Sequence, residues 1–250
     1  MSLAFRVIAR LDVKGANVIK GIQFEGLRVL GKPAAFARKY AAEGADEILY
    51  LDTVASLYGR ANLTAIIEEA SDGVFVPITA GGGVRSVDDV RSLLAAGADK
   101  VALNTAAIGE PRLIARCADR VGSQAIVCSI EAKKQGSGAW EAFTDQGRER
   151  TGKCAVTWAC EAAELGAGEI LLTAIDRDGT RRGADVALAA AIRPRVGCPV
   201  VLAGGIGNPR DACEAAEVAD GVVIGAALHY GGTSIAAVKA ALAGAGRTVR

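Results

Sequence analysis

GAGEILLTAIDRDGT, residues 166–180, joins a glycine-rich turn to an apolar run of strand length and then to an abrupt polar ending. The same design recurs as GADEILYLD from Gly44 and as GADKVALNT from Gly97. A continuous apolar run is typical of a strand that is buried on both faces, as in a parallel sheet covered by helices. The three copies therefore predict an α/β fold in which polar side chains gather where the strands end.

Apolar runs of strand length recur throughout the 250-residue chain, at Val7–Leu11, Ile48–Leu51, Val76–Thr79, Val101–Leu103, Ala125–Ile130, Ile170–Ala174, Pro199–Ala203 and Val222–Ile224. Segments with helical spacing lie between them, for example Pro33–Ala42, Val87–Ala96, Pro111–Arg120 and Ala155–Leu165. Eight such units predict a parallel (β/α)8 TIM barrel, and a doubly wound open sheet is the competing architecture. AGGGV at 80–84 is echoed by AGGIG at 203–207, half a chain away, which favours one barrel domain over residues 1–250 built from two similar half-barrels.

The bulk composition excludes several classes of protein. The net charge is +1 and no apolar run approaches the roughly 18 residues that span a bilayer, so we expect neither a nucleic-acid nor a membrane partner. The six cysteines form no C-x-x-C pair, and the single histidine is His229. We therefore expect a reduced, cytoplasmic setting, no metal, no cofactor, and acid–base chemistry based mainly on carboxylates, lysines or cysteines.

Glycines at the strand ends indicate two anion sites. The active site of a (β/α)8 barrel lies at the carboxyl ends of its strands, where glycine lets backbone N–H groups approach an anion closely. One predicted site comprises Gly82, Gly83, Asn104 and Thr105, and the other comprises Gly204, Gly205, Gly225 and Ala226. Two anion sites on opposite sides of one mouth predict an elongated substrate with two phosphates. The alternative is that these glycines only form tight turns.

Two carboxylates are candidates for acid–base catalysis. Asp12 and Glu131 end the first and fifth predicted strands, which face each other across an eight-stranded ring. Carboxylates on both sides of a substrate suit opposed general acid and general base roles, although ordinary polar strand ends are the alternative. Asp176 is expected to position substrate or to cap a loop. Lys20 lies in a predicted hairpin, VKGANVIKG, and is either a substrate clamp or a solvated lysine.

A second set of charges lies at the opposite end of the predicted strands. Two bases and two acids stand just before apolar runs, at Arg6, Glu47, Lys100 and Glu169. Charges at the amino-terminal mouth of a barrel usually serve stability, so a structural ring of ion pairs is one interpretation. A gate or a docking surface is the other.

The motifs also carry a family resemblance. They fall in order along the chain as LDVKG at 11–15, KGIQFEGLR at 20–28, LDTVAS at 51–56, TAGGGVR at 79–85, GADKVALNTAA at 97–107, GSQAIV at 122–127 and GAGEILLTAIDRDGT at 166–180. Together they resemble the cyclase subunit of imidazole glycerol phosphate synthase over essentially the whole chain. They also resemble, more distantly, the histidine-pathway isomerase with the same half-barrel repeat, but LDVKG and IDRDGT favour the cyclase.

The resemblance implies a reaction and a partner. Ammonia from a glutaminase subunit, bound at the amino-terminal face, passes through the barrel and attacks a bis-phosphorylated formimino-carboxamide ribonucleotide. The products are imidazole glycerol phosphate and an aminoimidazole carboxamide ribonucleotide, in histidine biosynthesis. The resemblance implies that the four charges at the amino-terminal mouth are an ammonia gate, and that Lys20 belongs to a mobile loop. The implied catalytic groups are Asp12 and Glu131, and the implied substrate-binding positions include Thr173, Asp176 and Gly179.

Four positions depart from the family pattern. Glu131, in SIEAK at 129–133, stands where the family has aspartate, Arg10 stands where it has cysteine, and Ala203 and Ala226 stand where it has serines. The extra methylene of Glu131 moves the charge outward, and a misplacement of ~1 Å can cost ~10²-fold in rate. Two alternatives therefore stay open. One is a paralogue that forms an amidine on a sugar in surface-polysaccharide biosynthesis, and the other is a weakly catalytic barrel that docks and activates a glutaminase.

Overall fold

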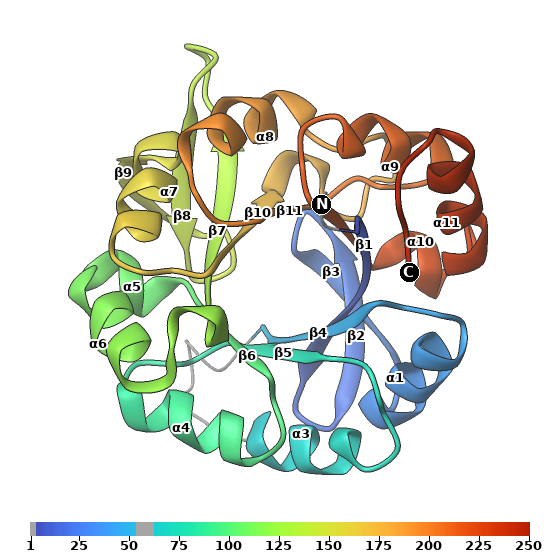
Figure 1. The fold of residues 1–250 in the computed structure, drawn as a ribbon, viewed down its shortest axis with the longest axis horizontal. Helices are drawn as coiled ribbons and strands as arrows, with labels where there is room; N and C mark the ends of the chain where they lie inside the picture. Colours follow the sequence, from blue (N-terminus) through green and yellow to red (C-terminus); the bar gives the residue numbers. More distant parts are fainter. Residues whose placement is uncertain (1–3, 54–62) are drawn as a thin grey trace.

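The computed structural model describes residues 4–53 and 63–250. Within this part of the chain, eight parallel strands form a closed barrel (Figure 1). Around the ring they are β1 (Arg6–Lys14), β4 (Glu47–Asp52), β5 (Ile78–Gly81), β6 (Lys100–Leu103), β7 (Ile126–Lys134), β10 (Glu169–Ala174), β11 (Val200–Ala203) and β12 (Gly221–Ile224). The ring closes because β12 pairs in parallel with β1. The predicted (β/α)8 TIM barrel is confirmed, and an open sheet is excluded.

Both half-barrels carry the same addition, an antiparallel hairpin after their first strand. β2 (Asn17–Ile22) and β3 (Glu25–Gly31) follow β1, and β8 (Trp140–Thr144) and β9 (Glu149–Cys154) follow β7. These pairings extend β1 and β7 beyond the predicted runs Val7–Leu11 and Ala125–Ile130. The turn between β1 and β2 matches the predicted hairpin VKGANVIKG, whereas β3 and the second hairpin have no counterpart in the sequence prediction. The duplicated hairpin supports the half-barrel repeat.

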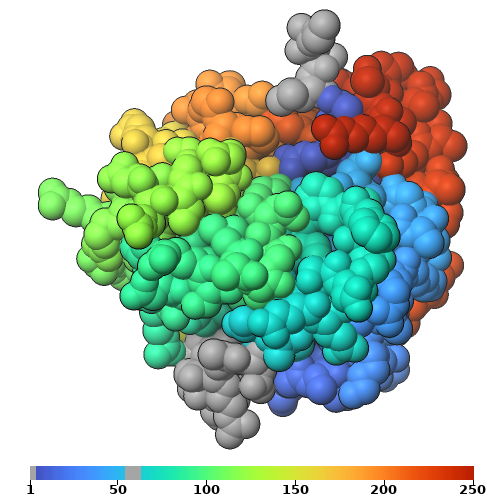
Figure 2. Space-filling view, turned by 60° about the horizontal axis from the view of Figure 1, so that its bottom comes forward, coloured from blue at the N-terminus to red at the C-terminus, as the bar shows by residue number. Residues whose placement is uncertain are grey.

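Helices cover the outside of the ring (Figure 1). They are α1 (Pro33–Ala42), α3 (Leu63–Ser71), α4 (Val87–Ala95), α5 (Thr105–Gly109), α6 (Arg112–Val121), α7 (Ala155–Glu164), α8 (Val186–Ile192), α9 (Pro209–Ala216), α10 (Ala226–His229) and α11 (Ile235–Gly244). Figure 2 shows part of this outer layer, in which α4 packs between α3 and α6. The four helices predicted from spacing agree with the structure to within one residue at each end.

Capping boxes place the glycine loops of the two halves. The Ser86 side chain accepts a hydrogen bond from the Asp89 N–H at the start of α4, and the Asp89 carboxylate accepts one from the Ser86 N–H. Asn208 and Asp211 make the same reciprocal pair at the start of α9. A capping box satisfies two N–H groups that have no partner within the helix. Both helices therefore begin at a defined residue, directly after the two glycine loops.

Inward positions alternate along each strand. On β1 the inward side chains are Arg6, Ile8, Arg10 and Asp12, from the amino-terminal mouth to the carboxyl-terminal mouth. Ile8 belongs to an apolar layer inside the ring that includes residues of β4, β7, β10, β11 and β12. One strand thus supplies charges to both mouths, with apolar side chains between them. None of the helices in the described residues has the length and apolar character needed to cross a bilayer.

Candidate active site

Asp12, at the carboxyl-terminal mouth, lies in a buried cluster of charges. Its Oδ1 accepts a hydrogen bond from Arg10 Nε at 2.6 Å, and its Oδ2 accepts one from Lys20 Nζ at 2.8 Å. Lys20 also donates to Asp178 Oδ2 at 2.9 Å, and each of these four side chains is at most 5% exposed. Burial raises the pKa of Asp12, but the charges of Arg10 and Lys20 more than offset it and hold the pKa well below its usual range. Asp12 is therefore ionised at neutral pH.

Lys20 is one of the least exposed charged residues of the molecule. It lies in β2, its side chain is 2% exposed, and both of its partners are aspartates. The alternative of a solvated lysine is therefore wrong. Its role as a substrate clamp stays a prediction.

The loop after β10 packs against the first hairpin and brings Asp178 to Lys20. The Gln23 N–H donates to the Asp178 carbonyl at 2.9 Å. Gly179 has a φ of +71°, and a Cβ there would lie 2.4 Å from the Gly21 carbonyl oxygen, so only glycine fits this junction. Sequence reasoning selected Asp176 and Gly179 in this loop and missed Asp178.

Asp176 has a different environment from Asp178. Its Oδ2 accepts a hydrogen bond from the Lys134 N–H at 2.9 Å, which joins the loop to the end of β7. It lines a separate, open depression together with Gln23 and Arg177. Asp176 therefore holds its loop against β7, and substrate positioning by Asp176 stays a prediction.

Glu131 lies on β7, four strands from β1 in either direction around the ring. Its Oε2 accepts a hydrogen bond from the Gly147 N–H, in the turn of the second hairpin, at 2.9 Å. Burial raises the pKa of Glu131 to about 7, although the positive charge of Arg10 opposes this shift. The environments of Asp12 and Glu131 thus shift their pKa values in opposite directions. Two such carboxylates suit the roles of general base and general acid.

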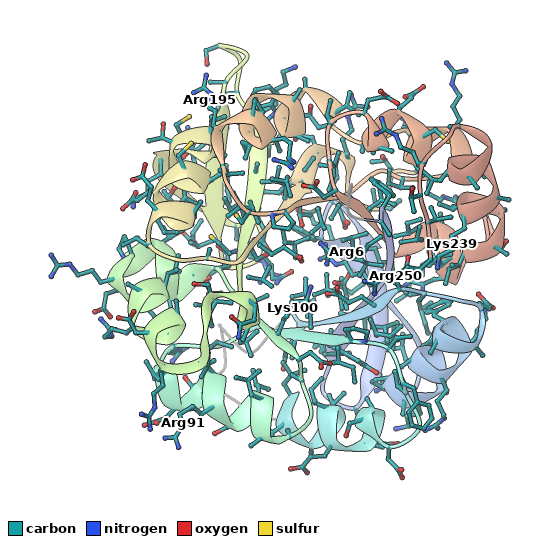
Figure 3. The ribbon with its side chains drawn as sticks, in the orientation of Figure 1. Arg6, Arg91, Lys100, Arg195, Lys239 and Arg250 are labelled. Carbon is teal, nitrogen blue, oxygen red and sulfur yellow. The ribbon has the colours of Figure 1, made fainter. Side chains whose placement is uncertain are left out.

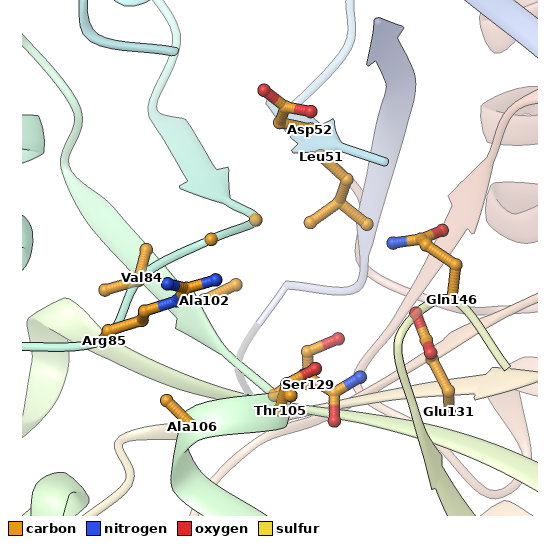
Figure 4. Close-up of a pocket in the computed structure, with 13 residues that line it drawn as sticks. Leu51, Asp52, Val84, Arg85, Ala102, Thr105, Ala106, Ser129, Glu131 and Gln146 are labelled. Atoms are coloured by element: carbon orange, nitrogen blue, oxygen red, sulfur yellow. The ribbon is translucent and has the colours of Figure 1, made fainter. Parts of the chain in front are cut away.

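A cavity of about 300 Å³ lies beside Glu131 (Figure 4). All four residues predicted for the first anion site line it, namely Gly82, Gly83, Asn104 and Thr105. Figure 4 shows Arg85 on one side of the cavity and Glu131 with Gln146 on the opposite side. Sequence reasoning missed Arg85 and Gln146 as lining residues. The motif TAGGGVR contains a signal for Arg85, because a cation two residues after a glycine loop remains close to it.

A narrower pocket, with about 10 Å³ of free volume, lies at the ends of β11 and β12. The predicted second anion site, Gly204, Gly205, Gly225 and Ala226, lines it. Arg10, Asp178, Gly179 and Arg181 complete its polar lining. Thr173 lies within the ring between the two pockets, 1% exposed, and pairs in register with Glu131 on one side and Ala203 on the other.

The charges at the amino-terminal mouth form a closed ring of ion pairs. Its two bases, Arg6 and Lys100, lie near the middle of the barrel in Figure 3. Arg6 donates to Glu47 at 3.1 Å and to Glu169 at 2.6 Å. Lys100 also bridges both acids, at 2.7 Å to Glu47 and 3.2 Å to Glu169. The Thr79 hydroxyl adds a hydrogen bond to Glu47, a contact that sequence reasoning missed. All four predicted residues are thus brought together in one hydrogen-bonded ring.

Comparison with known proteins identifies the family. The family model described as "Histidine biosynthesis protein" matches residues 6–234. A relative from Legionella pneumophila is 56% identical over 203 residues, covering 81% of this chain and 96% of its own length. One from Nocardioides sp. is 49% identical over 258 residues, covering 100% of both chains, and one from Myxococcus xanthus is 46% identical over 250 residues, covering 99% and 98%. Each is named imidazole glycerol phosphate synthase subunit HisF.

This chain belongs to the HisF family. The family assigns it to the cyclase subunits of imidazole glycerol phosphate synthase, enzymes of histidine biosynthesis, and the relatives' shared name describes a subunit of a complex. Of the motifs that carry the resemblance, only LDTVAS reaches beyond the described residues, at 54–56. Within this HisF-family barrel, the unusual residue Arg10 contacts the carboxylate predicted to be catalytic.

Proposed function

We propose that Asp12 and Glu131 carry out the proton transfers of the HisF cyclase reaction on a substrate that spans the carboxyl-terminal mouth. The observation that carries this proposal is the pair of inward carboxylates on opposite strands, one ionised and one with a pKa of about 7. Asp12 accepts a proton as general base, and Glu131 donates one as general acid. Turnover of the bis-phosphorylated ribonucleotide by the purified chain with an ammonium salt tests the assignment, and its absence would contradict it.

The first hairpin regulates the basicity of Asp12. While Arg10 and Lys20 both hold the carboxylate, it is a weak proton acceptor because its pKa is far below the operating pH. Movement of Lys20 away from Asp12 toward substrate would remove one cation and raise that pKa. The hairpin that carries Lys20 therefore acts as a clamp. When substrate binds, the clamp makes Asp12 a stronger base.

The two pockets suit the two phosphates of an elongated substrate. The 300 Å³ cavity beside Glu131 combines glycine backbone with Thr105 and Arg85. The second pocket combines four glycines with Arg10 and Arg181, and it must widen to admit a phosphate. Backbone N–H groups near helix N-termini are effective donors to phosphate. Phosphate or sulfate soaked into crystals is expected at both places.

A glutaminase subunit binds the amino-terminal face, in the cytoplasm, and delivers ammonia through the ring of Arg6, Glu47, Lys100 and Glu169. The apolar layer above this ring provides a path of low polarity toward the mouth. The ring is closed in this structure, since each base bridges both acids. Passage of ammonia therefore requires at least one of these ion pairs to open.

Lys100→Ala is expected to lower glutamine-dependent turnover several-fold more than turnover supported by ammonium salt. The substitution leaves Glu47 and Glu169 with Arg6 as the only cation of the ring, so their positions change at the point where ammonia enters. Both activities are measured on the same complex, with the exposed Lys39→Ala as control. An equal loss of the two activities would mean that the ring is only structural.

The pH profile of kcat/KM is expected to fall as pH rises through about 7. A raised pKa keeps Glu131 partly protonated at neutral pH, and ionisation above about 7 removes the general acid. Steady-state kinetics with saturating ammonia from pH 5.5 to 9 measure this, with free ammonia calculated at each pH. The inflection should disappear in Glu131→Gln, and its persistence there would assign it to another group.

The alternative of an amidine-forming paralogue is not favoured by the relatives, which share the name imidazole glycerol phosphate synthase subunit HisF. Glu131→Asp separates the two candidates. A cyclase with one altered residue should keep or gain turnover in this variant, whereas a paralogue should lack cyclase turnover in the wild type and in the variant alike.

A further inference from the structure

The Arg10 guanidinium is buried with unused donors. Its residue is 2% exposed, and Nε donates to Asp12 at 2.6 Å. Among the described residues, Nη1 and Nη2 have no hydrogen-bond partner, and Asp178 Oδ1 lies 4.0 Å from Nη1. Guanidinium has five N–H groups, and leaving buried charged donors unsatisfied is costly. Since nothing in residues 4–53 and 63–250 accepts from Nη1 or Nη2, these donors can bind an incoming anion.

The residue that carries these donors lies at the second pocket. Arg10 lines that pocket beside Gly204, Gly205, Gly225 and Ala226. The Phe24 ring stacks near the guanidinium, with 5.6 Å between Cζ and the ring centroid, and the bond to Asp12 holds the other edge. The guanidinium is therefore fixed in place before any ligand arrives.

We propose that Arg10 is an anion ligand of the second pocket, where Nη1 and Nη2 donate to the oxygens of a substrate phosphate. The inference deepens the proposed function and rests on it for the identity of the substrate. A bidentate arginine–phosphate pair is short, charge-assisted and directional. It takes the place of hydroxyl donors, since the nearby residues Ala203 and Ala226 have none.

The charges around the pocket permit this binding. Asp178 also lines the pocket, but its carboxylate is paired with Lys20 at 2.9 Å. The present free volume of about 10 Å³ is too small for a phosphate, so the loop of Gly179 and Arg181 moves outward when the anion enters. The Arg10 guanidinium then contacts the phosphate through Nη1 and Nη2 and Asp12 through Nε. Binding of phosphate in the pocket therefore helps to position Asp12.

The test is binding of inorganic phosphate by the full-length chain, measured by calorimetry and by crystals soaked in phosphate. Wild type is expected to bind two phosphates, one of them within hydrogen-bond distance of Arg10 Nη1 or Nη2. Arg10→Met keeps an unbranched side chain but removes the charge and all the guanidinium donors. It should weaken the second site by about 10- to 100-fold and leave the first site unchanged, so the first site reports on correct folding.

Two further variants sharpen the result. Arg10→Lys should retain part of the affinity, because a single ammonium can donate but not in a bidentate manner. Arg10→Met with Ala226→Ser should regain part of it, because the new hydroxyl lies at the pocket wall. Two phosphate sites of wild-type affinity in Arg10→Met would overturn the inference and limit Arg10 to holding Asp12. A chain that binds phosphate through Arg10 yet lacks cyclase turnover would overturn only the proposed function.

Discussion

Asp12→Asn is expected to lower ammonia-dependent turnover by ~10²–10⁴-fold, the usual contribution of a positioned proton-transfer group. The change keeps the size of the side chain and removes its capacity to accept a proton. Arg10 and Lys20 lose the carboxylate that they share, so the local structure is also perturbed. Turnover is therefore measured together with the free energy of unfolding.

Asp178→Asn is the matched comparison. It disturbs the same buried cluster by removing the second aspartate of Lys20, but it leaves the Asp12 carboxylate in place. We expect it to lose less activity than Asp12→Asn at comparable loss of stability. If the two variants lose activity equally, Asp12 acts by organising the charge cluster and not by transferring a proton.

Lys20→Met is expected to lower the free energy of unfolding by about 3–5 kcal/mol, the usual cost of breaking a buried ion pair. Lys20 neutralises Asp12 and Asp178, both of which are almost completely buried. Methionine fills the space of the lysine stem but leaves Arg10 as the nearest cation for two carboxylates. Urea unfolding at pH 7 measures the loss, and the control is Lys14→Met, which changes an exposed lysine at the end of β1.

The effect of Lys20→Met has a defined pH dependence. In the wild type, the lowered pKa of Asp12 contributes stability that is present above its unfolded pKa and is lost as pH falls through its folded pKa. Without Lys20 this contribution is smaller, so the difference between variant and wild type should shrink as pH falls and Asp12 becomes protonated. A difference independent of pH would attribute the loss to packing.

The placement of Arg10 could be anticipated only in part. Strand side chains alternate in direction, so Arg10 and Asp12 must point to the same face of β1. That spacing predicts their proximity. The position of Arg10 at the wall of the second pocket depends on the pairing of β12 with β1. The residues of β12 lie more than 200 positions further along the chain, so local sequence does not predict this contact.

Local patterns in the sequence determined the barrel, the two glycine loops, the opposed carboxylates and the four charges at the other mouth. These features follow from the alternation of apolar strands and helices and from the residue that ends each strand. Only the tertiary structure decided three further features. These are the second hairpin, the hydrogen bond from the Gly147 N–H to Glu131, and the pairing of Lys20 with Asp178. The reason is that burial and distance set the strength of an electrostatic interaction, and both depend on which distant segments pack together. Two aspartates of one short motif, Asp176 and Asp178, thus have different environments, the first beside an open depression and the second in a buried cluster.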